Sequence, residues 1–207
     1  MVDLHSVRFY GILDTGYVSP DAWEAKCLAL IEGGAGVIQM RAKKENHAQR
    51  RGLLERILTL FVGLDIPLIV NDDLELATSY PGLGLHIGQD DVSPEAARER
   101  LGTDRVLGLS THSLSQAMNA IRKAELLDYF AVGPIFATGT KPDYIPVGTS
   151  LVTKVRFLEP PLPFFCIGGI NRDNAGEVRA AGAFGVVAVS DVLMDPGTAN
   201  ATRAFLA

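Results

Sequence analysis

The chain has 207 residues, of which 47% are hydrophobic, and it carries a formal net charge of -5. This length suits one α/β barrel with nothing left for a second domain, so we expect residues 1–207 to form a single domain. The negative charge argues against a general nucleic-acid-binding surface. Any bound anion must therefore be held by local Lys or Arg side chains, backbone N–H groups or a metal ion.

Membrane and secreted proteins are also disfavoured. The longest apolar runs are far shorter than the ~18 residues that suggest a membrane span, and the first residues do not form a basic start followed by an apolar stretch. The two cysteines, Cys27 and Cys166, provide no disulfide framework, and we expect both to be small buried hydrophobes. We therefore expect a cytoplasmic protein that binds neither membrane nor nucleic acid. The oligomeric state stays open, a homodimer included.

Eight short apolar runs occur along the chain, and each ends in polar, charged or glycine residues. Most lack the in–out alternation of a half-exposed strand, which is typical of parallel strands buried on both faces. We expect these runs to be β-strands at residues 9–13, 37–40, 67–70, 84–88, 106–109, 129–133, 164–167 and 186–189.

Segments with helical periodicity separate the runs. The first is expected to begin with Ser19 as N-cap and Pro20 as first residue, and to end at Gly33 and Gly34. Others are expected at 46–62, 93–102, 113–126, 171–181 and 198–206. Strands that alternate with helices predict a (β/α)8 TIM barrel. A doubly wound open sheet is the alternative, but no G-x-G-x-x-G loop follows the first strand.

In such a barrel the C-terminal ends of all strands meet on one face, where the catalytic residues lie. Asn71-Asp72-Asp73 follows the third run, and Gln89-Asp90-Asp91 follows the fourth. Carboxylates on neighbouring strands can share one hard cation, so Asp72 and Asp91 are the predicted Mg²⁺ ligands. The alternative is that individual aspartates, such as Asp73 or Asp90, cap helices.

A basic cluster follows the second run, in Gln39-Met40-Arg41-Ala42-Lys43. Residues two apart on a strand point the same way, so Gln39 and Arg41 are expected to face the interior and mouth of the barrel. A buried Arg needs an anion, which here is either a ligand or an Asp inside the rim. Lys44 and Arg50-Arg51 are expected to form a solvated helix face.

Two further clusters suit phosphate groups. Thr138-Gly139-Thr140-Lys141 lies in the longest irregular stretch, residues 136–149, and offers hydroxyl donors and a positive charge for a diphosphate. The alternative is that this segment is a mobile polar loop that binds no phosphate. The segment does not match the Walker A spacing. Gly168-Gly169-Ile170-Asn171 and Val189-Ser190-Asp191 end the last two runs, where barrels often bind a phosphate, although a simple tight turn is the alternative. His86 and His112 read as hydrogen-bonded packing residues. A metal site, a diphosphate loop and a monophosphate site together predict group transfer with loss of diphosphate.

These clusters, in this order, resemble the thiamine-phosphate synthase family, also called thiamine-phosphate pyrophosphorylase. The resemblance runs from about Phe9 to Ser190, and seven segments carry it. They are Gln39-Met40-Arg41-Ala42-Lys43, Ile69-Val70-Asn71-Asp72-Asp73, Leu85-His86-Ile87-Gly88-Gln89-Asp90-Asp91, Gly108-Leu109-Ser110-Thr111-His112-Ser113, Gly133-Pro134-Ile135-Phe136-Ala137-Thr138-Gly139-Thr140-Lys141-Pro142, Ile167-Gly168-Gly169-Ile170 and Val189-Ser190.

The resemblance implies a (β/α)8 transferase that joins hydroxymethylpyrimidine diphosphate to hydroxyethylthiazole phosphate, with Mg²⁺ as cofactor, and releases diphosphate by a dissociative mechanism. It implies that Asp72 and Asp91 hold the metal and that Arg41, Lys43, Ser110 and Lys141 are catalytic. Its substrate-binding residues would be Gln39, Arg41, Lys43, Asn71, Ser110, Thr138, Thr140, Lys141, Gly169, Val189 and Ser190.

Three positions depart from the family pattern: Ala42 replaces an acidic residue, residues 142–148 replace a short Gly-containing stretch, and Asp191-Val192-Leu193 follows Ser190. A thiazole tautomerase, a related barrel, is the nearest alternative. It tends to lose the diphosphate-binding residues, which this chain keeps, and would need a proton-transfer residue such as His112. A non-catalytic barrel that binds a phosphorylated ligand is the third reading.

Overall fold

A computed structural model describes residues 3–139 and 145–207 of the chain. In this part, eight parallel strands close into a barrel in chain order, and the last strand pairs with the first. The predicted TIM barrel is therefore confirmed, and each predicted run overlaps a strand. The strands are β1 (Phe9–Asp14), β2 (Val37–Arg41), β3 (Leu68–Asn71), β4 (Gly84–Ile87), β5 (Leu107–Thr111), β6 (Tyr129–Val132), β7 (Phe164–Ile167) and β8 (Gly185–Ala188).

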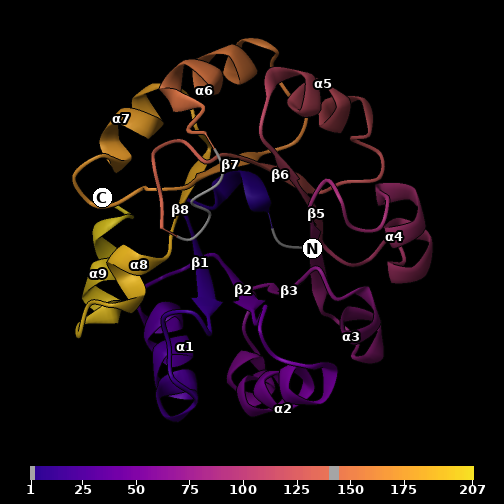
Figure 1. The fold of residues 1–207 in the computed structure, drawn as a ribbon, viewed down its shortest axis with the longest axis vertical. Helices are drawn as coiled ribbons and strands as arrows, with labels where there is room; N and C mark the ends of the chain where they lie inside the picture. Colours follow the sequence, from indigo (N-terminus) through magenta and orange to yellow (C-terminus); the bar gives the residue numbers. More distant parts are fainter. Residues whose placement is uncertain (1–2, 140–144) are drawn as a thin grey trace.

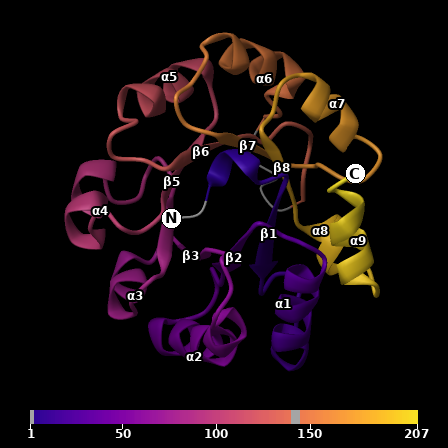
Figure 2. The same ribbon diagram turned by 180° about the vertical axis from the view of Figure 1, so that it is seen from behind.

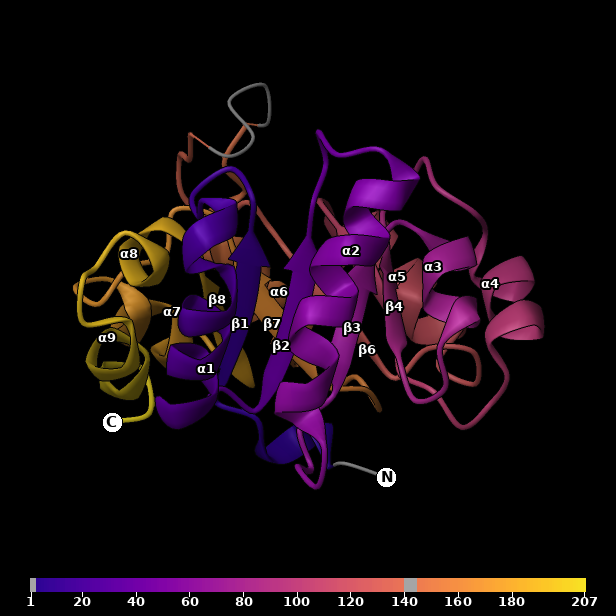
Figure 3. The ribbon, with the colours of Figure 1, turned by 90° about the horizontal axis from the view of Figure 1, so that it is seen from below.

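Helices form a ring outside the strands, as the two views along the barrel show (Figures 1 and 2). The α-helices are α1 (Trp23–Glu32), α2 (His47–Leu58), α3 (Leu74–Ser79), α4 (Pro94–Leu101), α5 (Leu114–Arg122), α6 (Gly148–Phe157), α7 (Ala175–Ala180), α8 (Ser190–Leu193) and α9 (Thr198–Ala204). Short 3-10 helices are η1 (Leu4–Ser6), η2 (Pro20–Ala22) and η3 (Thr59–Phe61). In the side view, η1 lies beneath the barrel, at the end opposite the arrowheads of β1 and β2 (Figure 3).

Side-chain caps begin several helices at the positions where the sequence predicts a helix to start. Ser93 and Ser113 accept backbone N–H groups at the starts of α4 and α5, and Asn46 forms a capping box with Gln49 at the start of α2. Ser19 differs, because its side chain makes no cap bond and the chain enters the 3-10 turn η2 before α1. Packing sets the start of that helix, since Trp23 is fully buried and donates its indole N–H to a carbonyl of α2.

The α-helices α3, α6 and α8 were not predicted as separate elements. Two of them are shorter than two turns, so their apolar periodicity is hard to recognise. The third, α6, begins at Gly148, inside the stretch 136–149 that was expected to be irregular. Residues 140–144 of that stretch lie outside the described residues.

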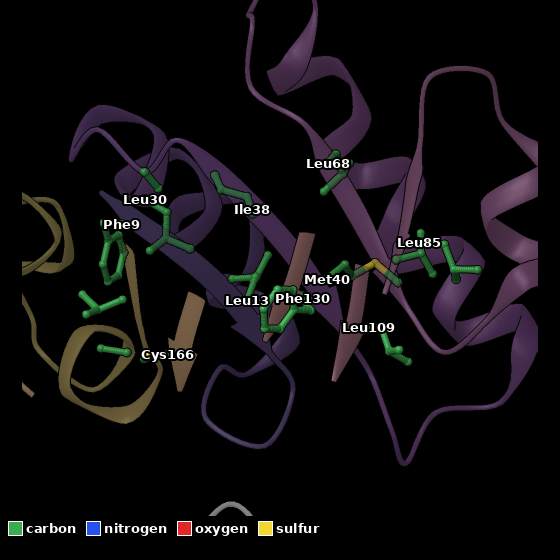
Figure 4. Close-up of a cluster of buried hydrophobic side chains, with 14 of the residues drawn as sticks. Phe9, Leu13, Leu30, Ile38, Met40, Leu68, Leu85, Leu109, Phe130 and Cys166 are labelled. Atoms are coloured by element: carbon green, nitrogen blue, oxygen red, sulfur yellow. The ribbon is translucent and has the colours of Figure 1, made fainter. Parts of the chain in front are cut away.

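Two apolar clusters hold the barrel. The larger one lies between the strands and the helices, and includes the buried Cys27 and Cys166; ten of its side chains, among them Leu13, Ile38 and Met40, are labelled in Figure 4. The smaller one includes inward-facing residues such as Val37 and residues from the η1 region. The same strands thus present apolar side chains on both faces, which explains why their sequences lack simple alternation.

Candidate active site

A cavity of about 570 Å³ lies at the carboxyl ends of the barrel strands. Each predicted site residue within the described ranges lines it. These residues are Gln39, Arg41, Lys43, Asn71, Asp72, Asp91, Ser110, Thr138, Gly169, Val189 and Ser190. The predicted residues Thr140 and Lys141 lie outside the described residues. Residues from seven loops and strands thus share one chamber of a size suited to small-molecule substrates.

Asp72 and Asp91 come together because β3 and β4 are neighbours in the barrel. Asp72 adopts a left-handed φ of 64°, and its N–H donates to the His86 carbonyl at 2.9 Å. Asp91 Oδ2 accepts the Gly88 N–H at 2.7 Å. Partial burial, and then the Asp72 carboxylate beside it, raise the pKa of Asp91. Two carboxylates this close together fit a site for a hard divalent cation.

Asp73, next to this pair in the sequence, has a structural role. Asp73 caps α3, since its Oδ1 accepts the Leu76 N–H at 2.9 Å, and its Oδ2 accepts from Arg50 Nη1 at 2.8 Å. Capping, the alternative for these aspartates, therefore applies to Asp73. The expectation that Arg50 belongs to a solvated helix face is wrong. Its side chain is half-buried and also donates to the Ala42 carbonyl. Among the described residues, no group of three or more His, Cys, Asp or Glu could hold a metal. A Mg²⁺ ion held here would need water or substrate oxygens as well.

Gln39 and Arg41 face inward as their period-two spacing predicts, and both line the cavity. Arg41 Nη1 lies 2.5 Å from Asp14 Oδ2, so the alternative of an Arg–Asp pair inside the rim is what the structure contains. Asp14 is only 2% exposed and lies opposite Arg41 in the strand register. The sequence reasoning did not assign Asp14 to the site. A period-two reading of β1 would have placed it inward, at the strand end next to Arg41.

The two histidines are both hydrogen-bonded, as expected for packing residues. His86 contacts the Tyr129 hydroxyl through Nδ1 at 2.8 Å and the Ser110 hydroxyl through Nε2 at 2.9 Å. His112 Nδ1 lies 2.6 Å from the Gly133 carbonyl, which can only accept, so this nitrogen carries the proton. Both rings line the cavity wall.

The ends of β7 and β8 supply backbone groups rather than charged side chains. Gly168 and Gly169 have φ values of 100° and 63°. A Cβ on Gly169 would lie 2.5 Å from the Ala137 carbonyl oxygen, so only glycine fits there. Helix α8 begins at Ser190, and the N–H groups of Ser190 and Asp191 precede its first helical hydrogen bond, which Val192 donates to the Val189 carbonyl.

Of the departures from the family pattern, Asp191 lines the cavity, whereas Ala42 does not. The Ala42 side chain is buried in the outer core. Asp191 pairs with Arg172 at 2.9 Å, while Val192 and Leu193 pack in the outer core. The third departure is residues 142–148, of which the structure describes only residues 145–148.

Comparison with known proteins agrees with this arrangement. The sequence model described as thiamine monophosphate synthase matches residues 9–192. The thiamine-phosphate synthase of Chloroflexus aurantiacus is 40% identical over 202 residues, covering 95% of this chain and 89% of the relative. That of Herpetosiphon aurantiacus is 38% identical and covers 97% and 95%. A solved thiamine phosphate pyrophosphorylase from Pyrococcus furiosus superposes with a TM-score of 0.86 at 27% identity, covering 99% of this chain and 96% of the solved one.

None of the helices in residues 3–139 and 145–207 has the length and apolar character to cross a membrane.

Proposed function

The chain belongs to the thiamine monophosphate synthase family, and on that premise we propose how its barrel mouth performs the family's reaction. The enzyme is a transferase that condenses hydroxymethylpyrimidine diphosphate with hydroxyethylthiazole phosphate to give thiamine phosphate and diphosphate. The observation that carries the proposal is that one cavity holds an aspartate pair, basic side chains and a glycine-rich loop.

The diphosphate would be bound between β2 and β3. Arg41, Lys43 and Asn71 line this side of the cavity and would contact its oxygens, with Lys141 adding a further positive charge. Asp72 and Asp91 would hold Mg²⁺, which when bound neutralises charge on diphosphate and makes it a better leaving group. The closeness of these two carboxylates supports the metal assignment.

The organic parts of the two substrates would meet beneath this anion site. Gln39 and Ser110 would orient the pyrimidine. Thr138, Thr140 and Lys141 would contact the thiazole phosphate and diphosphate. Backbone N–H groups at Gly169, Val189 and Ser190 would cradle the thiazole phosphate, because the glycine lets the backbone approach closely.

The proposed reaction is dissociative. The bond from the pyrimidine methylene carbon to diphosphate breaks, and its electron pair leaves with the diphosphate. The aminopyrimidine stabilises the cation, and the lone pair of the thiazole nitrogen then forms the new bond. This route requires positioning and charge stabilisation rather than a nucleophile on the enzyme. The residues that would position the substrates and stabilise charge, each in contact with substrate, are Arg41, Lys43, Ser110 and Lys141.

The direct test is diphosphate release by purified protein, with each substrate alone and with both, in the presence of Mg²⁺ or a chelator. Release that needs both substrates and Mg²⁺ is the expected result. Isomerisation of the thiazole carboxylate phosphate without diphosphate release would instead indicate a tautomerase. We also propose a single-domain cytoplasmic enzyme whose partners are small phosphorylated molecules and not nucleic acid, and light scattering would test a homodimer.

A further inference from the structure

Four charged side chains form a cluster beside the loops that we assign to the thiazole phosphate. Arg172, in the loop between β7 and α7, donates from Nε to Asp191 Oδ2 at 2.9 Å, and its Nη1 lies 3.0 Å from Asp195 Oδ2. Lys26 of α1 reaches the same turn, because its Nζ donates to the Asp195 carbonyl at 2.8 Å. Helices α1, α8 and α9 are neighbours in the outer ring (Figure 1). Two carboxylates and two cations thus balance each other at this point of the rim.

Asp191 is the member of this cluster that lines the cavity. It directly follows Val189 and Ser190, whose backbone N–H groups are assigned to the phosphate. Its side chain is 22% exposed, so water screens its charge only in part. A carboxylate in this position opposes the binding of a phosphate dianion, because like charges repel.

Arg172 provides the opposite charge from outside the cavity. It is not among the described residues that line the cavity, and its guanidinium is directed at Asp191 and Asp195. An arginine side chain does not lose its proton in a protein, so this counter-charge is permanent. The pair that Arg172 forms with Asp191 therefore removes most of the repulsion that the carboxylate alone would exert on a bound phosphate.

The loop that carries Arg172 is braced by other side chains. Asn171 Oδ1 accepts the Asp173 and Asn174 N–H groups at 2.9 and 3.0 Å. Asn174 Nδ2 donates to the Gly169 carbonyl at 3.0 Å. The Arg172 side chain itself is 42% exposed. Its replacement should therefore leave the shape of the loop intact and change only the charge beside it.

We propose that Arg172 cancels the charge of Asp191, and that this pair sets the affinity of the enzyme for the thiazole phosphate. The inference rests on the proposed function, which supplies the phosphate site. Arg172 is a positioning residue within it, because it acts through Asp191 and not on the substrate.

The test measures the binding of hydroxyethylthiazole phosphate to the whole protein by isothermal titration calorimetry. In Arg172→Gln the Asp191 carboxylate is no longer cancelled, and we expect Kd to rise roughly 10-fold. Arg172→Lys keeps a positive charge and should bind within about 3-fold of the wild type. Thermal melts confirm that each variant is folded.

The deciding variant adds Asp191→Asn to Arg172→Gln. It removes the carboxylate that Arg172 cancels, so binding should recover to within about 3-fold of the wild type. Asp191→Asn alone should bind no more weakly than the wild type, because the Arg172 charge remains near the site. If Arg172 contacted the phosphate directly or held the loop in shape, the double variant would bind as weakly as Arg172→Gln.

Arg56 and Glu24 provide the matched control. They form an arginine–carboxylate pair between α2 and α1, with exposed fractions of 38% and 39%, and neither residue lines the cavity. Arg56→Gln, Glu24→Gln and the corresponding double variant should bind the thiazole phosphate as the wild type does.

Steady-state kinetics provide a second measurement. In Arg172→Gln the KM for hydroxyethylthiazole phosphate should rise with Kd. The KM for the pyrimidine diphosphate should stay within about 2-fold, because its proposed site lies at the ends of β2 and β3 and distant charges are screened.

Wild-type affinity in Arg172→Gln, or a folded double variant as weak as Arg172→Gln, would overturn the proposal. Thiamine phosphate formation by the wild type is measured in parallel. Its absence would count against the proposed function, whereas turnover without recovery in the double variant would count against the charge pair alone.

Discussion

Asp72 Oδ2 lies 3.0 Å from Lys43 Nζ, so the carboxylate that we assign to Mg²⁺ is paired with the lysine that we assign to the diphosphate. Both side chains are partly exposed, at 30% and 50%, and such pairs contribute little to stability. The pairing therefore costs little to break. Its effect is to keep both groups at the same point of the rim, where the cation and the diphosphate would meet.

Asp72→Asn should lower kcat/KM by roughly 100-fold or more, because the amide is a weak ligand for a hard cation. Asn tolerates the left-handed φ of 64° at this position, whereas Ala would add backbone strain. The melting temperature should therefore change little. Steady-state kinetics across a Mg²⁺ titration, alongside a thermal melt, provide the measurement. Asp90→Asn, which removes an exposed carboxylate nearby, is the control, and a fully active Asp72→Asn enzyme would refute the metal assignment.

Asp91→Asn should inactivate the enzyme yet stabilise the metal-free protein at neutral pH. The pKa of Asp91 is raised above the ordinary value of 3.8, so the folded protein binds the extra proton. Stability from this group is fully present below that value and is lost as the pH rises through the raised pKa. The Asn side chain does not ionise, so the variant keeps its stability as the pH rises. The difference in melting temperature between variant and wild type should therefore grow from acidic to neutral pH.

Mg²⁺ provides the second half of that experiment. Millimolar Mg²⁺ should raise the melting temperature of the wild type at pH 7, because a ligand that binds only the folded state stabilises it. Asp91→Asn should show a much smaller rise. Equal rises in the two proteins would place the cation somewhere other than the Asp72–Asp91 pair.

Asp14→Asn should reduce both stability and activity. The Asp14 carboxylate is buried, pairs with Arg41 and also accepts the Gly16 N–H at 2.8 Å. Loss of its charge leaves a largely buried guanidinium without a counter-ion, at a cost of about 2–4 kcal/mol. Urea denaturation would measure this. The KM for the pyrimidine diphosphate should also rise, since Arg41 is no longer held in place. An unchanged urea concentration at the unfolding midpoint would show that Arg41 finds another partner in the variant.

The features that sequence reasoning predicted well depend on strand position alone. In a parallel barrel every strand delivers the residues after it to one rim, so finding the strand ends also located Asp72, Asp91 and Ser110. The predicted helix starts at Ser93 and Ser113 are also confirmed, each with a side-chain cap, whereas the cap predicted at Ser19 is not formed.

The features that sequence reasoning missed depend on side-chain choices between strands. Whether Arg41 meets a ligand or Asp14 is decided by the register of β1 and β2 and by a rotamer. The link from His86 to Tyr129 needs Gly108 on the strand between them, and no local pattern reveals it. Helix α6 was missed because its start at Gly148 follows a Gly- and Pro-rich stretch that is typical of a loop.

Gly169→Ala should weaken binding of the thiazole phosphate specifically. At this position φ is 63°, and a Cβ would meet the Ala137 carbonyl oxygen at 2.5 Å and Phe136 Cβ at 2.8 Å. The backbone of the loop must therefore shift, and its N–H groups would no longer point toward the bound phosphate. We expect the KM for hydroxyethylthiazole phosphate to rise about 10-fold or more, and the KM for the pyrimidine diphosphate to rise much less.

Gly176→Ala is the matched control for that substitution. Gly176 lies in helix α7, and a Cβ there would meet nothing within 4 Å. Alanine in a helix is favoured over glycine by roughly 1 kcal/mol, so this variant should be slightly more stable and equally active. If Gly169→Ala raised both KM values to the same extent, the loop after β7 would serve the whole cavity rather than the thiazole phosphate. That outcome would move the monophosphate site away from Gly169 and toward the start of α8.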